Sequence, residues 1–303
     1  MFELLLIPYI DQSSFKPEDT MRRILYFLGT NMAILVVLGI VLSIITPYLP
    51  PELQHGAGAN LLFAAVFGMG GAFISLWMSK GAAKRAAGVQ VIESPSNEVE
   101  TWLVNTVARQ AEQAGIGMPE VGIFPANEPN AFATGANRNN ALVAVSVGLI
   151  NNMSRDEVEA VLGHEVAHVA NGDMVTMTLL QGVLNTFVFF FARIVAQVVD
   201  KGRRGGIGYF ATYMVAQVVF GFIASIITAK FSRAREYRAD EGGAKLSSKQ
   251  NMIAALEKLK QGQTGELPNQ LAAFGISSGA KKLFSTHPPL DDRIKALHDN
   301  NEF

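Results

Sequence analysis

The sequence contains no cysteine, and that absence excludes two kinds of site. A disulfide framework needs paired cysteines, and a thiolate zinc site needs cysteine ligands. Any zinc ion bound by this chain must therefore be held by histidine and carboxylate side chains. The lack of cysteine leaves the redox compartment of the protein open.

Charged residues are scarce as well. They make up 17% of the 303 residues, hydrophobic residues make up 49%, and the formal net charge is −1. This composition is too apolar for an ordinary soluble protein and indicates a membrane protein with a water-facing part. The near-neutral net charge gives no support to nucleic-acid binding, so no nucleic-acid partner is expected.

The first twenty residues lack the features of a signal peptide. A short apolar run is followed by the polar residues 11–19, without a basic start or a small-residue cleavage site. Met21, followed by Arg22 and Arg23, is more typical of a natural start. We therefore interpret residues 1–20 either as an N-terminal extension or as the result of a mis-called initiation site, and we assign them no function.

Four uncharged apolar segments are present, and they come as two pairs. They are Ile24–Ile45, Leu61–Ser79, Met174–Ala192 and Ile207–Ala229. A helix of about 20 apolar residues, at ~1.5 Å per residue, crosses a hydrocarbon core of about 30 Å. The sequence predicts a mainly α-helical membrane protein with four transmembrane helices in two hairpins, at residues 21–79 and 174–229.

The first hairpin carries signals for packing and for orientation. Small residues in its second segment would let membrane helices approach closely. They are Gly68, Gly70, Gly71 and Ala72. Basic residues precede the first segment and follow the second, whereas the loop at 46–60 has none. Both ends of the hairpin should therefore face the cytoplasm.

The second hairpin allows two interpretations. Its first segment contains several polar residues, namely Thr176, Thr178, Gln181 and Asn185. If both segments cross completely, the basic loop at 200–206 lies on the far side, against the positive-inside rule. Otherwise the hairpin enters the bilayer only partly. We favour two complete spans.

Two water-facing blocks remain, residues 80–173 and 230–303, and together they are long enough for one compact domain. Residues 98–114 are predicted to form an amphipathic helix. Residues 121–124 and 141–147 are predicted to form strands, because valines in the second run alternate with small residues. The expected domain is of the α+β class.

The motif HEVAH stands at residues 164–168 in the first block. On a helix, His164 and His168 lie on one face about 6 Å apart, so both imidazoles can bind one zinc ion. Glu165 then lies where it can act as general base on the attacking water. A capping box at residues 154–157 supports a helix. The alternative is two surface histidines on an ordinary helix.

A catalytic zinc ion needs a third protein ligand and an open position. Glu236 and Asp240 are four residues apart and share one helical face. Glu236 can bind the metal, and Asp240 can accept the remaining ring N–H of a ligating histidine. From spacing alone, a solvated helix face with salt bridges to Arg233 and Arg235 is the better explanation of the two acids.

Several motifs together resemble the M48 metalloproteases, and most closely their HtpX branch of bacterial inner-membrane zinc proteases. The motifs are HEVAH followed by Asn171-Gly172-Asp173, the Glu236 and Asp240 pair after an apolar hairpin, Asn130-Ala131-Phe132 upstream, and Thr286-His287-Pro288-Pro289 downstream. The resemblance extends from Met21 to the C-terminus. It implies a zincin-like metalloprotease domain and an enzyme of the stress response.

The resemblance also implies roles for individual residues in the metal site. One zinc ion per chain would be bound by His164, His168 and Glu236, with Glu165 as general base and Asp240 holding a ligating histidine. Without the resemblance, these assignments rest only on the spacing described above.

Further residues of the site follow from the resemblance alone. Residues 130–132 (Asn130, Ala131 and Phe132) would begin an edge strand that pairs with an extended substrate, although Asn130 is also an ordinary turn residue. His287 and Arg293 would lie at the active site, where they stabilise the oxyanion or close the open zinc position in a resting state. By itself, His287 simply precedes a helix.

The expected function is that of a membrane-anchored zinc endopeptidase of the bacterial inner membrane, with its active site facing the cytoplasm. The resemblance implies substrates that are misfolded or damaged membrane proteins, and self-cleavage is a further hypothesis. A site-2-type intramembrane protease is an alternative, but the polar residues 154–159 and 171–173 flank the motif. A non-catalytic membrane adaptor with a structural zinc ion is disfavoured, because structural zinc usually has four protein ligands.

Overall fold

The computed structural model describes residue 47 and residues 57–200, 206–262 and 285–300. Residue contacts divide the chain into two units, Met1–Leu49 and Pro50–Phe303, and every helix and strand described below belongs to the second unit. The predicted span Ile24–Ile45 and the extension at residues 1–20 lie outside the described residues.

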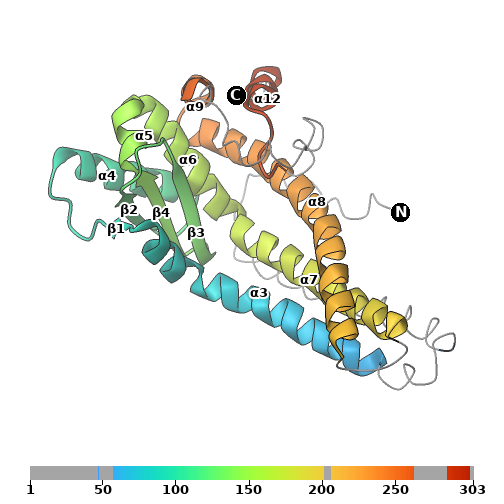
Figure 1. The fold of residues 1–303 in the computed structure, drawn as a ribbon. Coiled ribbons are helices and arrows are strands. Elements are labelled where there is room, and N and C mark those ends of the chain that lie inside the picture. Colours follow the sequence, from blue (N-terminus) through green and yellow to red (C-terminus); the bar gives the residue numbers. More distant parts are fainter. Residues whose placement is uncertain (1–46, 48–56, 201–205, 263–284, 301–303) are drawn as a thin grey trace. The chain divides into compact units, whose positions relative to one another are not determined.

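The described part of the chain is mostly helical, with one small sheet (Figure 1). The helices are α3 (Ala57–Ala87), α4 (Glu98–Gln113), α5 (Val147–Asn152), α6 (Arg155–Asn171), α7 (Asp173–Val199), α8 (Ile207–Leu246), α9 (Lys249–Gly262) and α12 (Leu290–Asp299). The strands are β1 (Gln90–Val91), β2 (Glu120–Phe124), β3 (Ala131–Asn137) and β4 (Asn140–Ser146).

The sheet has the strand order β1-β2-β4-β3. β2 runs parallel to β4, whereas β1 and β3 are antiparallel to their neighbours. The predicted strands at 121–124 and 141–147 match β2 and β4 to within one residue at each end. β1, with two residues, was not predicted. Among the described strands β3 lies at one edge of the sheet, which leaves one side of its backbone without a partner strand.

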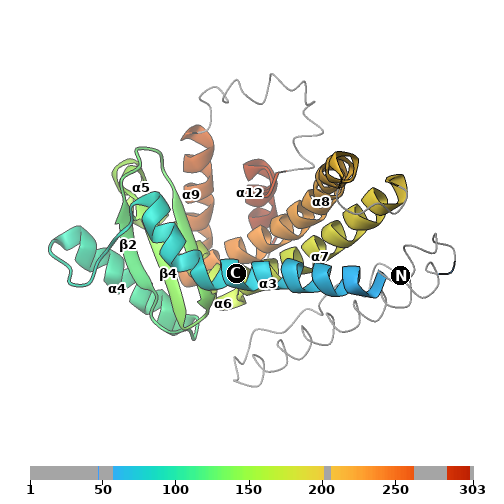
Figure 2. The same cartoon turned by 60° about the horizontal axis from the view of Figure 1, so that its bottom comes forward.

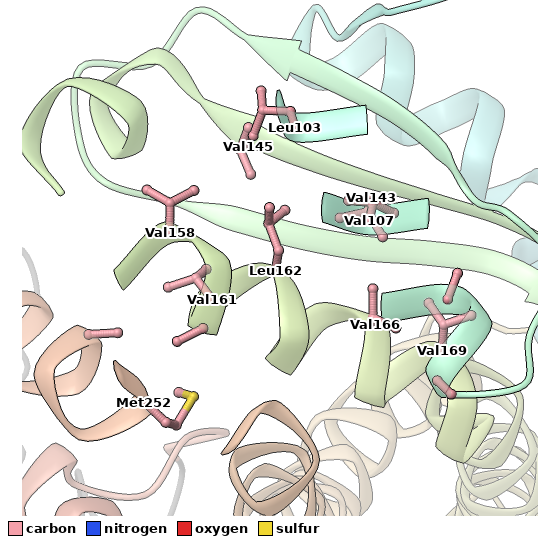
Figure 3. Close-up of a cluster of buried hydrophobic side chains, with 14 of the residues drawn as sticks. Leu103, Val107, Val143, Val145, Val158, Val161, Leu162, Val166, Val169 and Met252 are labelled. Carbon is pink, nitrogen blue, oxygen red and sulfur yellow. The ribbon is translucent and has the colours of Figure 1, made fainter. Parts of the chain in front are cut away.

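The main core lies between one face of the sheet and helices α4 and α6. Val143 and Val145 of β4 face this core, because alternate residues of a strand point to the same side. Side chains of α6 such as Leu162 and Val166 point toward them (Figure 3). Each fully buried valine or leucine contributes about 1.5–3 kcal/mol relative to an exposed one. This burial fixes the rotation of α6 and turns its polar face toward α8.

The ends of α6 are set by local signals. The Ser154 side chain accepts from the Glu157 backbone N–H, and the Glu157 side chain accepts from the Ser154 N–H, so the predicted capping box is present. Gly172 ends the helix in the left-handed conformation, with φ 67°. A residue with a side chain is strained in this conformation, so glycine suits the helix end.

Glycines allow α6 and α8 to pack at very short range. A Cβ atom added at Gly242 would lie 2.4 Å from the Cβ of Ala167. A Cβ atom added at Gly243 would lie 3.0 Å from the backbone nitrogen of His164. Because the two helices approach so closely, the side chains that precede these glycines on α8 lie directly against the HEVAH face of α6.

Three of the described helices are long and apolar enough to cross a membrane: α3 over Asn60–Ala87, α7 and α8. α3 and α8 both pack against α7 (Figure 1). A Cβ atom at Gly68 would lie 2.5 Å from Thr186 Oγ1, so α3 and α7 touch at this glycine. Gly70 and Gly71 have nothing within 4 Å of an added Cβ atom, so only some of the predicted small residues lie at a close helix–helix contact.

α8 is one continuous helix of 40 residues. It joins the predicted span Ile207–Ala229 to the predicted water-facing helix without a break. Its N-terminal half exposes large apolar side chains, whereas its C-terminal part buries Glu236 and Asp240 against α6. The helices α9 and α12 lie beside this C-terminal part (Figure 2). A single rigid element therefore runs from the apolar segment to the candidate site.

Candidate metal centre

The two histidines of HEVAH and Glu236 meet between α6 and α8. Ligand atoms from His164, His168 and Glu236 all lie within 4.8 Å of one another. The two Nε2 atoms are 3.2 Å apart. Glu236 Oε2 lies 3.6 Å from Nε2 of His164, and Oε1 lies 3.4 Å from Nε2 of His168. Two imidazole nitrogens and a carboxylate thus converge on one point.

The chemistry and spacing of these atoms fit zinc. Ligand atoms at about 2.0–2.2 Å from a tetrahedral zinc ion lie roughly 3.3–3.6 Å from one another, which is close to the three distances observed. Glu236 Oε2 is buried, and within the described part of the chain no group makes a well-aligned hydrogen bond to it. Its charged neighbours include His287 Nδ1 at 2.9 Å and Arg293 Nη1 at 3.5 Å. A buried carboxylate oxygen of this kind is suited to a cation.

The remaining nitrogen of His164 faces Asp240. Nδ1 of His164 lies 3.0 Å from Asp240 Oδ1. Asp240 is buried and also accepts hydrogen bonds from the guanidinium of Arg293, including one of 2.7 Å from Nε to Oδ2. Asp240 therefore lies where it can hold His164 with Nδ1 protonated and Nε2 turned toward the cluster.

The remaining nitrogen of His168 faces Asp173, a residue without a role in the site predicted from the sequence. Nδ1 of His168 lies 2.7 Å from Oδ2 of Asp173, whose side chain is buried. The only signal in the sequence was an acid directly after the glycine that ends the HEVAH helix. Spacing could not reveal the contact, because it depends on the turn at Gly172.

The buried acids change the protonation of both histidines in the metal-free protein. Burial, the largest effect, lowers the pKa of His168, but hydrogen bonds to Asp173 and Glu236 outweigh it and raise this pKa to about 10. For His164, burial is again the largest effect, and hydrogen bonds to Asp240 and Glu236 raise the pKa above its usual value. Zinc binding would therefore have to displace protons from this pair.

Glu165 follows His164 on α6 and is half-buried. Its negative charge contributes to the raised pKa values of His168 and Arg293. The carboxylate therefore lies within electrostatic range of the cluster, which is compatible with the role of general base.

Arg293, on α12, is 6% exposed and is held by Asp240. Its Nη1 lies 3.5 Å from Glu236 Oε2. The resemblance implies a role at the active site, and the structure places the guanidinium against two acids of α8 rather than on an open surface. Arg293 can therefore fix the position of these acids.

His287 lies on the solvent side of the cluster. Its side chain is 65% exposed, and its Nδ1 lies 2.9 Å from Glu236 Oε2. The segment before it is held by Arg233, whose Nη1 donates to the Ser285 carbonyl oxygen at 2.8 Å. Of the residues at the cluster, His287 is the exposed one, so it is the one that an incoming substrate can meet.

Residues 130–132 lie at the start of the edge strand β3, which contacts α6 and α7. The Asn130 backbone bonds toward β4: its N–H donates to Ser146 Oγ, and its carbonyl accepts from the Ser146 N–H. Because outward and inward groups alternate along an antiparallel strand, the backbone groups of Ala131 and Ala133 point to the open edge. The Phe132 side chain packs near Phe124, with ring centroids 5.4 Å apart.

A cavity of about 220 Å³ lies between α7 and α8. Its lining includes several polar side chains from the apolar helices, and it reaches Thr286, the residue before His287. These side chains are Gln181, Asn185, Ser225 and Thr228. The cavity therefore connects the membrane-facing helices with the neighbourhood of the cluster.

Comparison with known proteins places these features in a family context. The model of peptidase family M48 matches residues 97–301. Protease HtpX of Tolumonas auensis is 56% identical over 290 residues, which cover 92% of this chain and 99% of that relative. Protease HtpX of Thioalkalivibrio sulfidiphilus is 56% identical over 293 residues, covering 91% and 98%. The crystal structure of S. mikatae Ste24p has a similar fold, with a TM-score of 0.62, 18% identity, and coverage of 91% of this chain and 67% of that one.

Proposed function

This chain belongs to peptidase family M48, and from that premise we propose that it is a zinc-dependent endopeptidase of the bacterial inner membrane that cleaves misfolded membrane proteins on the cytoplasmic side. The relatives and the apolar helices support the coarser statement, a membrane metalloprotease. The metal, the orientation and the substrates are the proposed parts.

One observation carries the proposal. His164, His168 and Glu236 converge in a buried site, with distances between their atoms that match a tetrahedral zinc ion. When bound, zinc supplies Lewis acidity that acidifies water and polarises a carbonyl group. Three protein ligands leave one position open, as a catalytic site requires and a structural site does not.

The other residues then have defined tasks. Glu165 takes a proton from the attacking water at its carboxylate and passes it to the leaving amine nitrogen. His287, exposed beside Glu236, donates a hydrogen bond to the oxygen on which negative charge develops. Arg293 and Asp240 keep the ligands in place. None of these tasks depends on a particular substrate side chain.

The edge strand β3 offers a binding mode for the substrate. Pairing of an extended chain with the outward backbone groups of Ala131 and Ala133 recognises the main chain rather than the sequence. Only an unfolded or locally unwound segment can present such a backbone. This requirement supports misfolded proteins as substrates.

Two features support a site next to the cytoplasmic membrane surface. Lys80 and Lys84, at the end of the apolar part of α3, both form salt bridges with Glu120 of β2, so the sheet lies at the basic end of this helix. Basic residues mark the cytoplasmic end of a span. Among the described helices, α6 is not one of the three candidate spans, which disfavours an intramembrane protease.

The proposal is tested with purified full-length protein in detergent. We expect about one zinc ion per chain and cleavage of an unfolded protein such as casein. Glu165→Gln should retain the metal and lose cleavage, because only the base is removed. Unchanged cleavage by this variant would contradict the mechanism. The same pair of proteins tests self-cleavage, which should follow zinc addition in the wild type alone.

A further inference from the structure

Asp173 is the first residue of α7, and its side chain is only 2% exposed. Burying an ionised carboxylate is costly unless it is paired. Asp173 is paired with the imidazole of His168, at 2.7 Å from Oδ2 to Nδ1. The contact crosses from the membrane-facing helix α7 to the helix that carries HEVAH.

The contact depends on the break between the two helices. In a continuous helix, a residue five positions after His168 would lie about 140° away around the helix axis. Gly172, with φ 67° and ψ 32°, ends α6 and redirects the chain. Asp173 therefore begins a new helix with its carboxylate turned back to the histidine.

The two histidines are supported in the same way by acids from different helices. Asp240 of α8 contacts Nδ1 of His164, and Asp173 of α7 contacts Nδ1 of His168. In both cases Nε2 faces the cluster. A carboxylate on Nδ1 fixes the tautomer whose Nε2 lone pair is free for a metal.

We infer that Asp173 is a positioning residue, which holds His168 with Nδ1 protonated and Nε2 directed at the metal. The inference rests on the proposed zinc site and adds a residue to it. Both helices of the second apolar hairpin then contribute to the metal site: α8 supplies one ligand, and α7 supplies the acid that orients a second ligand, His168. A merely structural role, in which Asp173 only starts α7, predicts an effect on folding and none on the metal.

The test is zinc affinity of the full-length protein in detergent, measured by competition with a chromophoric chelator at one pH. In Asp173→Asn the side-chain amide can donate to Nδ1 and favour the wrong tautomer, so affinity should fall about 10- to 100-fold. The visible spectrum of the cobalt-substituted protein should also change. The control Asp156→Asn removes another first-turn acid, which is exposed at the start of α6. It should change neither the zinc affinity nor the cobalt spectrum.

The zinc-free melting temperature separates positioning from folding. Wild-type affinity and an unchanged cobalt spectrum in Asp173→Asn would overturn the inference. If Asp173→Asn does not fold, Asp173→Ser is measured instead, because serine is small and polar but carries no charge; it should show the same loss of zinc affinity. If the wild type binds no zinc, the proposed function fails; if the wild type binds zinc and the variants match it, only the inference fails.

Discussion

Arg293 on α12 donates hydrogen bonds to both carboxylate oxygens of Asp240 on α8, although 53 residues separate them. The same carboxylate contacts His164. Arg293 is therefore one contact removed from a proposed metal ligand, and its effect on the site should pass through Asp240.

Replacing Arg293 should lower both stability and metal affinity. Arg293→Ala leaves Asp240 buried without its cation, and breaking such a buried pair costs about 3–5 kcal/mol. Denaturant unfolding in detergent measures the loss. Arg155→Ala is the matched control, since its salt bridge with Glu98 is exposed and screened by solvent, and so contributes little to stability. Equal losses in the two variants would refute a special role for Arg293.

The contact between α6 and α8 should not tolerate an added methyl group. Gly242→Ala would place a Cβ atom 2.4 Å from that of Ala167, and overpacking of this kind costs about 1–3 kcal/mol. It should also weaken zinc binding, because Glu236 moves with α8. Gly221→Ala, on the same helix with nothing within 4 Å of the added Cβ, should be neutral or stabilising. Thermal unfolding and zinc content distinguish the two variants.

His287 should contribute to the reaction more than to metal binding. His287→Ala removes an exposed donor, so zinc content should remain while kcat/KM for casein falls about 10²-fold or more. His298→Ala, exposed on α12, serves as control. A rise in activity would instead indicate that His287 closes the site in a resting state, and an unchanged rate would exclude either role.

The raised pKa of His168 predicts opposite effects of pH on the metal-free and zinc-bound proteins. The pKa is about 10 in the folded protein, against about 6.5 when unfolded. Its stabilising contribution is thus fully present below pH 6.5 and is lost as pH rises toward 10. Zinc needs neutral imidazole, so zinc affinity should rise over the same range. Melting temperatures with chelator and with zinc, from pH 6.5 to 9.5, should diverge; parallel curves would contradict the assignment.

Local patterns in the sequence predicted much of the fold. The capping box at Ser154, the i, i+4 spacing of the histidines and the alternation around Val143 each depend on neighbours in the chain, and each appears in the structure as expected. β1 has only two residues, too few for a periodic signal.

What could not be predicted depends on contacts over long distances or on the direction of the chain. The pairing of Arg293 with Asp240 joins residues far apart in sequence. The contact of Asp173 with His168 depends on the left-handed turn at Gly172. The sequence showed that α3 carries several small residues, but only the structure shows that Gly68 is one that faces α7.

The central claim is that α6 and α8 together hold one zinc ion, and zinc content of purified variants tests it most directly. The wild type should contain about one zinc ion per chain. Glu236→Gln should contain far less and cleave nothing, whereas Glu241→Gln, five residues further along the same helix, should retain both metal and activity. A Glu236→Gln protein with full zinc content and wild-type cleavage would contradict the account.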